Sequence, residues 1–147
     1  MKTTHQLLRL LAAATALSIA SVHVAILNQH LEEQPYVGGL FLAAILALQF
    51  VALELAQQRR DRVLDRAAWL GGSAIVTSMF ALFVVSRTIG LPGYREPWDA
   101  IGIASLTLEG LFVALAITNE ALVRIGRSHA RIERSMRMDV DEVAEAA

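Results

Sequence analysis

Five side chains that could bind a metal, a proton or an anion lie within or beside long apolar stretches: His23, His30, Arg87, Glu96 and Glu109. Two imidazoles with a carboxylate are suitable ligands for a zinc- or copper-type ion, so the two histidines with either glutamate form one candidate metal site. A haem or quinone held by His23, with Arg87 near its polar group, is a second hypothesis. The third is structural: Glu109 pairs with Arg87 or accepts a hydrogen bond from His23.

A proton pathway is a further hypothesis for the same region. A lone carboxylate in an apolar helix, here Glu109, resembles a proton-relay residue. Ser105 precedes it by one helical turn and shares its face. Gln49 and Ser86 are other polar residues within apolar stretches. Ser105, Gln49 and Ser86 are therefore candidate site residues, in addition to the five above.

Several function classes are excluded or gain no support. The chain has no cysteine, which excludes disulfides, thiolate metal sites and cysteine nucleophiles. It has no Ser-His-Asp order, HExxH motif, Walker loop or Rossmann glycine pattern. A formal net charge of -1 gives no general attraction to nucleic acid. No catalytic function is indicated, and whether the protein is an enzyme stays open.

Four apolar blocks would have to position these residues. The chain has 147 residues, of which 55% are hydrophobic, and the apolar residues gather in blocks long enough to cross a bilayer as helices. The predicted helices are about 7–28, 37–56, 67–86 and 101–123. Because short connections make neighbouring helices antiparallel, the predicted fold class is all-α: a four-transmembrane-helix, up-down-up-down bundle.

Basic residues predict the orientation. Eleven of the 13 Lys and Arg residues lie at the N-terminus, between the second and third blocks, or after the fourth: Lys2, Arg9, Arg59, Arg60, Arg62, Arg66, Arg124, Arg127, Arg131, Arg134 and Arg137. The positive-inside rule then predicts a multi-pass protein of the cell (plasma) membrane with both termini in the cytoplasm. The interfacial aromatic residues agree, with Tyr36, Tyr94 and Trp98 at the outer interface and Trp69 at the inner one.

The connection between the third and fourth blocks should complete an outward-facing polar site. Its GLPG turn, residues 90–93, would fold Arg95 and Glu96 over the mouth of the bundle. The predicted transmembrane domain is residues 1–126. Residues 127–147 are predicted to form a cytoplasmic tail, basic and then acidic, whose first part is a helical extension of the fourth helix.

Two segments carry a family resemblance: SVHVAILNQHLEEQPYVGGLFLAAILALQ, and VVSRTIGLPG followed by EPW and a glutamate in the fourth helix. They resemble small, four-helix, uncharacterised integral membrane proteins of the actinobacterial, chloroflexi and haloarchaeal type. The similarity covers roughly residues 23–112. The matching positions are His23, His30, Gln49, Ser86, Arg87, Gly90, Pro92, Glu96 and Glu109. The resemblance implies that the outer polar site is one functional unit, and it implies no substrate.

We expect, first, a small accessory or assembly subunit of a larger membrane complex. The first alternative is a metal-, haem- or quinone-binding membrane protein that uses His23, His30 and Glu109. The second is a proton-coupled small-solute transporter that acts as a homo-oligomer. The expected partners are the lipid bilayer and either other membrane subunits or further copies of the chain, with no nucleic acid.

Overall fold

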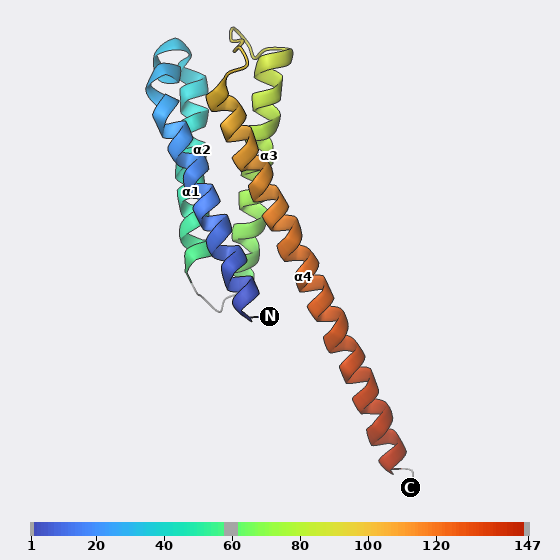
Figure 1. Cartoon of the computed structure of the whole chain (residues 1–147). Helices are drawn as coiled ribbons and strands as arrows, with labels where there is room; N and C mark the ends of the chain where they lie inside the picture. Colours follow the sequence, from blue (N-terminus) through green and yellow to red (C-terminus); the bar gives the residue numbers. More distant parts are fainter. Residues whose placement is uncertain (1, 58–61, 146–147) are drawn as a thin grey trace. The chain divides into compact units, whose positions relative to one another are not determined.

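The computed structural model describes residues 2–57 and 62–145, and it is all-helical there. The helices are α1 (Lys2–Glu33), α2 (Pro35–Ala56), α3 (Arg62–Thr88) and α4 (Ala100–Glu145) (Figure 1). Each is long and apolar enough to cross a membrane. The four predicted spans lie within these helices, so the all-α fold class and the number of possible crossings are confirmed.

Some predicted topology determinants cannot be placed. Arg59 and Arg60 lie outside the described residues, and the side chains of Lys2, Arg62, Arg134 and Arg137 are likewise outside the described part of the structure.

The chain divides into two compact units, Met1–Ala116 and Ile117–Ala147. The first holds α1, α2, α3 and the start of α4, together with all eight candidate site residues. In the second unit, α4 continues with polar residues exposed. Arg124 Nε lies 2.9 Å from Glu120 Oε1, one helical turn away, as an exposed ion pair.

A single residue separates α1 from α2. The N–H of Gln34 donates to the carbonyl of His30 at 2.9 Å, which completes the last turn of α1. Pro35 then occupies the start of α2, where its missing N–H and fixed φ are tolerated. The sequence QP therefore ends one helix and begins the next.

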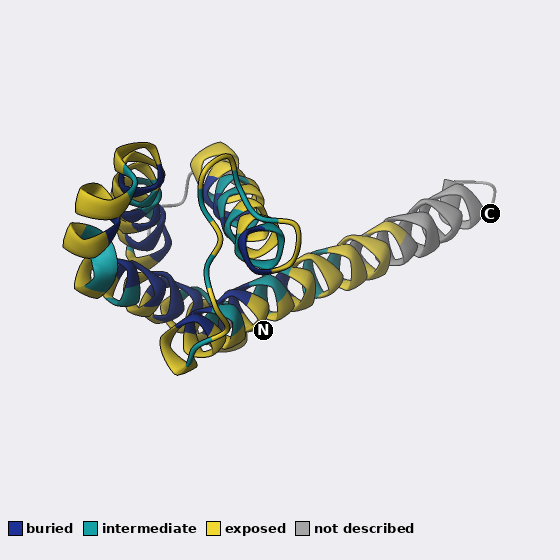
Figure 2. Cartoon of the chain, turned by 90° about the horizontal axis from the view of Figure 1, so that it is seen from above, coloured by how far each residue is buried: buried dark blue, intermediate teal, exposed yellow. Residues whose placement is uncertain are grey.

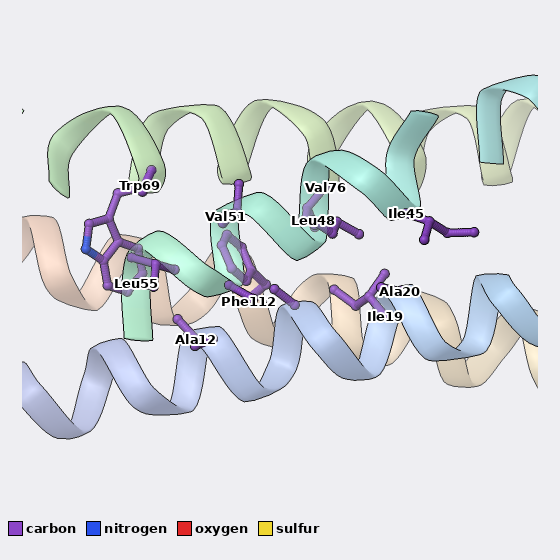
Figure 3. Close-up of a cluster of buried hydrophobic side chains, with 14 residues drawn as sticks. Ala12, Ile19, Ala20, Ile45, Leu48, Val51, Leu55, Trp69, Val76 and Phe112 are labelled. Carbon is purple, nitrogen blue, oxygen red and sulfur yellow. The ribbon is translucent and has the colours of Figure 1, made fainter. Parts of the chain in front are cut away.

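Small residues on α1 allow a close-packed apolar core. Ala12 and Ala16 are fully buried there. The core extends from Trp69 and Leu55 at one end to Ala20 and Ile45 at the other (Figure 3). Phe112 of α4 is fully buried within it. Alanine lets helix backbones approach closely in lipid, where dispersion replaces the hydrophobic effect as the main attraction between helices.

Trp69, predicted at the inner interface, packs its side chain into the apolar core. It is only 6% exposed and belongs to the apolar core. Its ring centroid lies 6.2 Å from that of Phe112. Gly72, one turn later, leaves room for Phe112, because a Cβ there would lie 2.7 Å from the Cζ of that ring. Packing between α3 and α4 therefore draws the indole inward.

Apolar side chains are exposed on all four helices. Figure 2 shows exposed residues along one side of each helix and buried residues along another. Leu17, Leu46, Leu70 and Leu111 are each about half exposed or more, at 50%, 59%, 61% and 47%. Exposure on this scale is unfavourable in water and ordinary in hydrocarbon. The surface and the four long apolar helices together indicate a multi-pass membrane protein.

Arg9 joins the ends of three helices. Its Nη2 donates to the carbonyls of Glu54, at 3.1 Å, and Gln57, at 2.6 Å. Its Nε donates to the carbonyl of Leu55 at 3.1 Å. Its Nη1 lies 2.7 Å from Asp65 Oδ1 on α3. These carbonyls have no partner within α2, so a guanidinium satisfies them and opposes the negative end of the helix dipole.

Candidate functional site

The site is built around the connection between α3 and α4. Leu91, Pro92, Gly93 and Tyr94 form a tight turn in which the Leu91 N–H donates to the Tyr94 carbonyl at 2.7 Å. Proline at the second position and a glycine with φ of 70° at the third are typical of a type II turn. The predicted GLPG turn is thus present.

The turn is tied to the start of α2. Gln34 Nε2 donates to the carbonyl of Gly93 at 3.0 Å, and the Tyr36 hydroxyl donates to the carbonyl of Pro92 at 2.8 Å. These bonds bring the α1–α2 and α3–α4 connections together. Tyr94 and Glu96 both contact His30 of α1, and Glu96 also contacts Arg87 of α3.

Arg87 is the centre of the charge network. It is 8% exposed, and its Nη1 lies 2.8 Å from Glu96 Oε2. Its Nη2 lies 3.2 Å from Asp99 Oδ2. The guanidinium carbon lies 3.6 Å from the centroid of the Phe83 ring, a cation–π contact. Gly102 permits this arrangement, because a Cβ there would lie 2.7 Å from Arg87 Nη2.

His30 is 2% exposed and connects α1 to the same network. Its Nδ1 lies 2.9 Å from the carbonyl of Ile26, so Nδ1 carries a proton and donates. Its Nε2 lies 2.9 Å from the Tyr94 hydroxyl and 3.3 Å from Glu96 Oε1. Burial, followed by the nearby Glu96 carboxylate, raises the pKa of Tyr94, so the phenol stays protonated. A neutral His30 accepts from that phenol, and an imidazolium donates to Glu96.

His23 is 5% exposed and has the same tautomer-setting bond. Its Nδ1 donates to the carbonyl of Ile19 at 2.9 Å. In the neutral ring, Nε2 therefore carries the lone pair that could accept a hydrogen bond or ligate a metal. Phe41 packs against both imidazoles, with centroid distances of 4.8 Å to His23 and 4.5 Å to His30.

Glu109 is 1% exposed, and its carboxylate is only half satisfied. Ser105 Oγ donates to its Oε1 at 3.0 Å. Its Oε2 is buried without a hydrogen-bond partner among the described residues. The structural hypothesis expected a bond from Arg87 or His23. Instead, Arg87 pairs with Glu96 and Asp99, which enter from the connection, so the expected partnership of Glu109 is wrong.

These side chains line a cavity of about 480 Å³, here named the His–Glu cavity. Seven of the predicted site residues line it: His23, His30, Ser86, Arg87, Glu96, Ser105 and Glu109. Gln49 does not. It is exposed on the surface of α2, because the neighbouring Leu48 and Ala52 are the residues that face the core.

No group of three or more His, Cys, Asp or Glu side chains within the described residues is placed to hold a metal ion. The predicted ligands share the cavity, but Glu96 is engaged by Arg87 and His30. The geometry therefore gives the metal hypothesis no support, and the metal, haem and quinone hypotheses stay predictions.

The cavity residues that were not among the predicted site residues include Phe41, Phe83, Tyr94 and Asp99. Asp99 has a recognisable signal. It precedes an apolar helix, and its Oδ1 accepts from the N–H of Gly102, as expected of a helix N-cap. Its second oxygen is then free for Arg87. The aromatic residues look like ordinary lipid-facing or interfacial residues in the sequence, and only the packing gives them a place in the cavity.

Comparison with protein-family models, with curated proteins and with solved structures finds no match to this chain.

Proposed function

We propose that this chain is a multi-pass membrane protein that binds a small molecule in the His–Glu cavity. The observation that carries the proposal is Glu109, a fully buried carboxylate that lines the cavity with one oxygen unpartnered. An unpaired buried carboxylate is costly in a membrane protein and is typical of functional sites. The cavity volume, about 480 Å³, lies within the range of small-molecule sites.

The proposed topology places this cavity at the outer face of the cell (plasma) membrane. The proposal is an up-down-up-down bundle with both termini, and the helical extension after the fourth span, in the cytoplasm. Its support is the position of eleven of the 13 basic residues. They lie at the N-terminus, between the second and third spans, or after the fourth span, which in an up-down bundle is the end opposite the cavity. The resemblance to the small four-helix membrane proteins described above is part of the same proposal.

The test is chemical analysis of protein purified gently from its own membrane. We expect a stoichiometric small molecule in an organic extract of the wild-type protein and its loss from Ala44→Trp, in which an indole fills part of the cavity lined by Ala44. Leu46→Trp is the matched control, because Leu46 is 59% exposed and faces away from the core. Equal amounts of the small molecule in the extracts of Ala44→Trp and Leu46→Trp would contradict the proposal.

The same preparation tests the other hypotheses. An absorption spectrum and elemental analysis would show a haem or metal that depends on His23. A larger complex that co-purifies would favour the accessory-subunit hypothesis. Exposed apolar side chains do not favour it, because lipid explains them equally well. Proton-coupled transport has one observation in its favour, the buried Glu109 carboxylate, and should be abolished by Glu109→Gln.

A further inference from the structure

We propose that the ligand of the His–Glu cavity is a lipophilic ammonium cation whose N–H donates to Glu109 Oε2. This inference rests on the proposed function and adds the chemical class of the ligand. It follows from the charges around the cavity, from the one oxygen left without a donor, and from the aromatic side chains of the wall.

The ionisable side chains of the cavity carry an excess of negative charge. Four carboxylates and two guanidinium groups line it: Glu33, Glu96, Asp99 and Glu109, with Arg87 and Arg95. Each imidazole donates through Nδ1 to a backbone carbonyl and, in its neutral form, adds no charge. A cavity of this composition attracts cations and repels anions such as phosphates and fatty-acid carboxylates.

Most of these charges already have partners. Arg87 binds Glu96 at 2.8 Å and Asp99 at 3.2 Å. Glu33 accepts from Gln29 Nε2 at 2.9 Å, on the exposed side of α1. Arg95 donates to the carbonyl of Thr88 at 2.9 Å and so points back along its own connection.

Glu109 remains. Its only hydrogen bond in the described structure comes from the uncharged Ser105 hydroxyl, and its second oxygen is buried and unpaired. Either a bound proton or a bound cation must neutralise such a group in a membrane. A protonated amine does so directly, because it brings both a positive charge and an N–H donor to Oε2.

The rest of the wall suits an apolar substituent on that nitrogen. Phe41, Met79, Leu82 and Phe83 line the cavity, as does Tyr94. Aromatic faces also attract cations, and Phe83 already makes such a contact with Arg87. A hydrophilic ammonium ion would leave this surface unused, so the inferred ligand has an aromatic or aliphatic body of modest size.

The experiment compares two probes of nearly identical shape in the full-length protein in lipid nanodiscs. Benzyldimethylamine is an ammonium ion at neutral pH. Isobutylbenzene replaces its N–H by C–H and is neutral. Calorimetric titrations, with empty nanodiscs subtracted, are made on the wild type, on Glu109→Gln and on Glu54→Gln. Glutamine at 109 keeps the oxygen that accepts from Ser105, and Glu54 is a carboxylate of α2 that does not line the cavity.

We expect the wild type and Glu54→Gln to bind the ammonium probe about 10- to 100-fold more tightly than isobutylbenzene, the range for a hydrogen bond to a charged group. Glu109→Gln should lose this preference while its affinity for isobutylbenzene is unchanged. Equal affinity for both probes in the wild type, or a preference that survives in Glu109→Gln, would overturn the ammonium inference and leave the cavity a binding site for neutral molecules. Binding of neither probe would overturn the inference, and with no molecule extracted from wild-type protein it would also refute the proposed function.

Discussion

Replacing Arg87 by Met tests whether the charge network holds the connection against the helices. Methionine keeps much of the apolar stem but removes the partner of Glu96 and Asp99 and the contact with Phe83. Breaking a buried ion pair by removing one partner costs about 3–5 kcal/mol. The Asp99 side chain is 41% exposed and the Glu96 side chain 18%, so water relieves part of that cost. We therefore expect a loss of about 3 kcal/mol in the free energy of unfolding.

The assay is a denaturant titration of the full-length protein in micelles, followed by circular dichroism. Arg124→Met is the matched control, because its ion pair with Glu120 is exposed, with side-chain exposures of 75% and 50%. That pair should contribute no more than about 0.5 kcal/mol. Adding Asp99→Asn to Arg87→Met should restore part of the loss by removing one uncompensated charge. If Arg87→Met costs no more than Arg124→Met, the network does not stabilise the fold and this reasoning is wrong.

Three further substitutions probe separate features in the same titration. Arg9→Leu should cost about 2 kcal/mol by leaving α2 carbonyls unpaired, and a change below about 0.5 kcal/mol would contradict the capping role. Gly93→Ala should cost about 1 kcal/mol because of its φ of 70°, whereas helical Gly39→Ala, with open space around it, should cost nothing. Phe112→Ala should cost about 3–5 kcal/mol because it leaves a cavity in the core. A smaller loss of stability than that of Leu111→Ala, at an exposed position, would refute the placement of Phe112 in the core.

The four spans were predictable because the bilayer imposes a simple length and polarity rule. The helix ends were not, and α1 begins at Lys2 and ends at Glu33, beyond the predicted 7–28. Helical hydrogen bonding continues past the apolar block until a residue such as Pro35 prevents it. The composition of an apolar block therefore predicts which residues could span the bilayer, but it does not predict the residue at which the helix ends.

The grouping of several polar residues toward one end of the helices was also predictable, and their partners were not. His23, His30 and Glu109 were expected near one end of the bundle, and they share one cavity. Which groups meet depends on the rotation of each helix and on the connection after α3, and neither follows from hydropathy. The connection supplies Glu96 and Asp99 to Arg87, and so leaves Glu109 without the partner expected for it.

The position of Trp98 gives the molecule an intrinsic fluorescent reporter. Its ring lies edge-on to that of Phe83, with centroids 5.6 Å apart. Phe83 lines the His–Glu cavity and makes the cation–π contact with Arg87. The chain has two tryptophans, and the other, Trp69, belongs to the apolar core. In a Trp69→Phe protein, all indole emission would therefore come from a residue in contact with the cavity wall. Occupation of the cavity could then be followed by emission wavelength and quenching in the purified protein in a lipid bilayer, without attaching a dye.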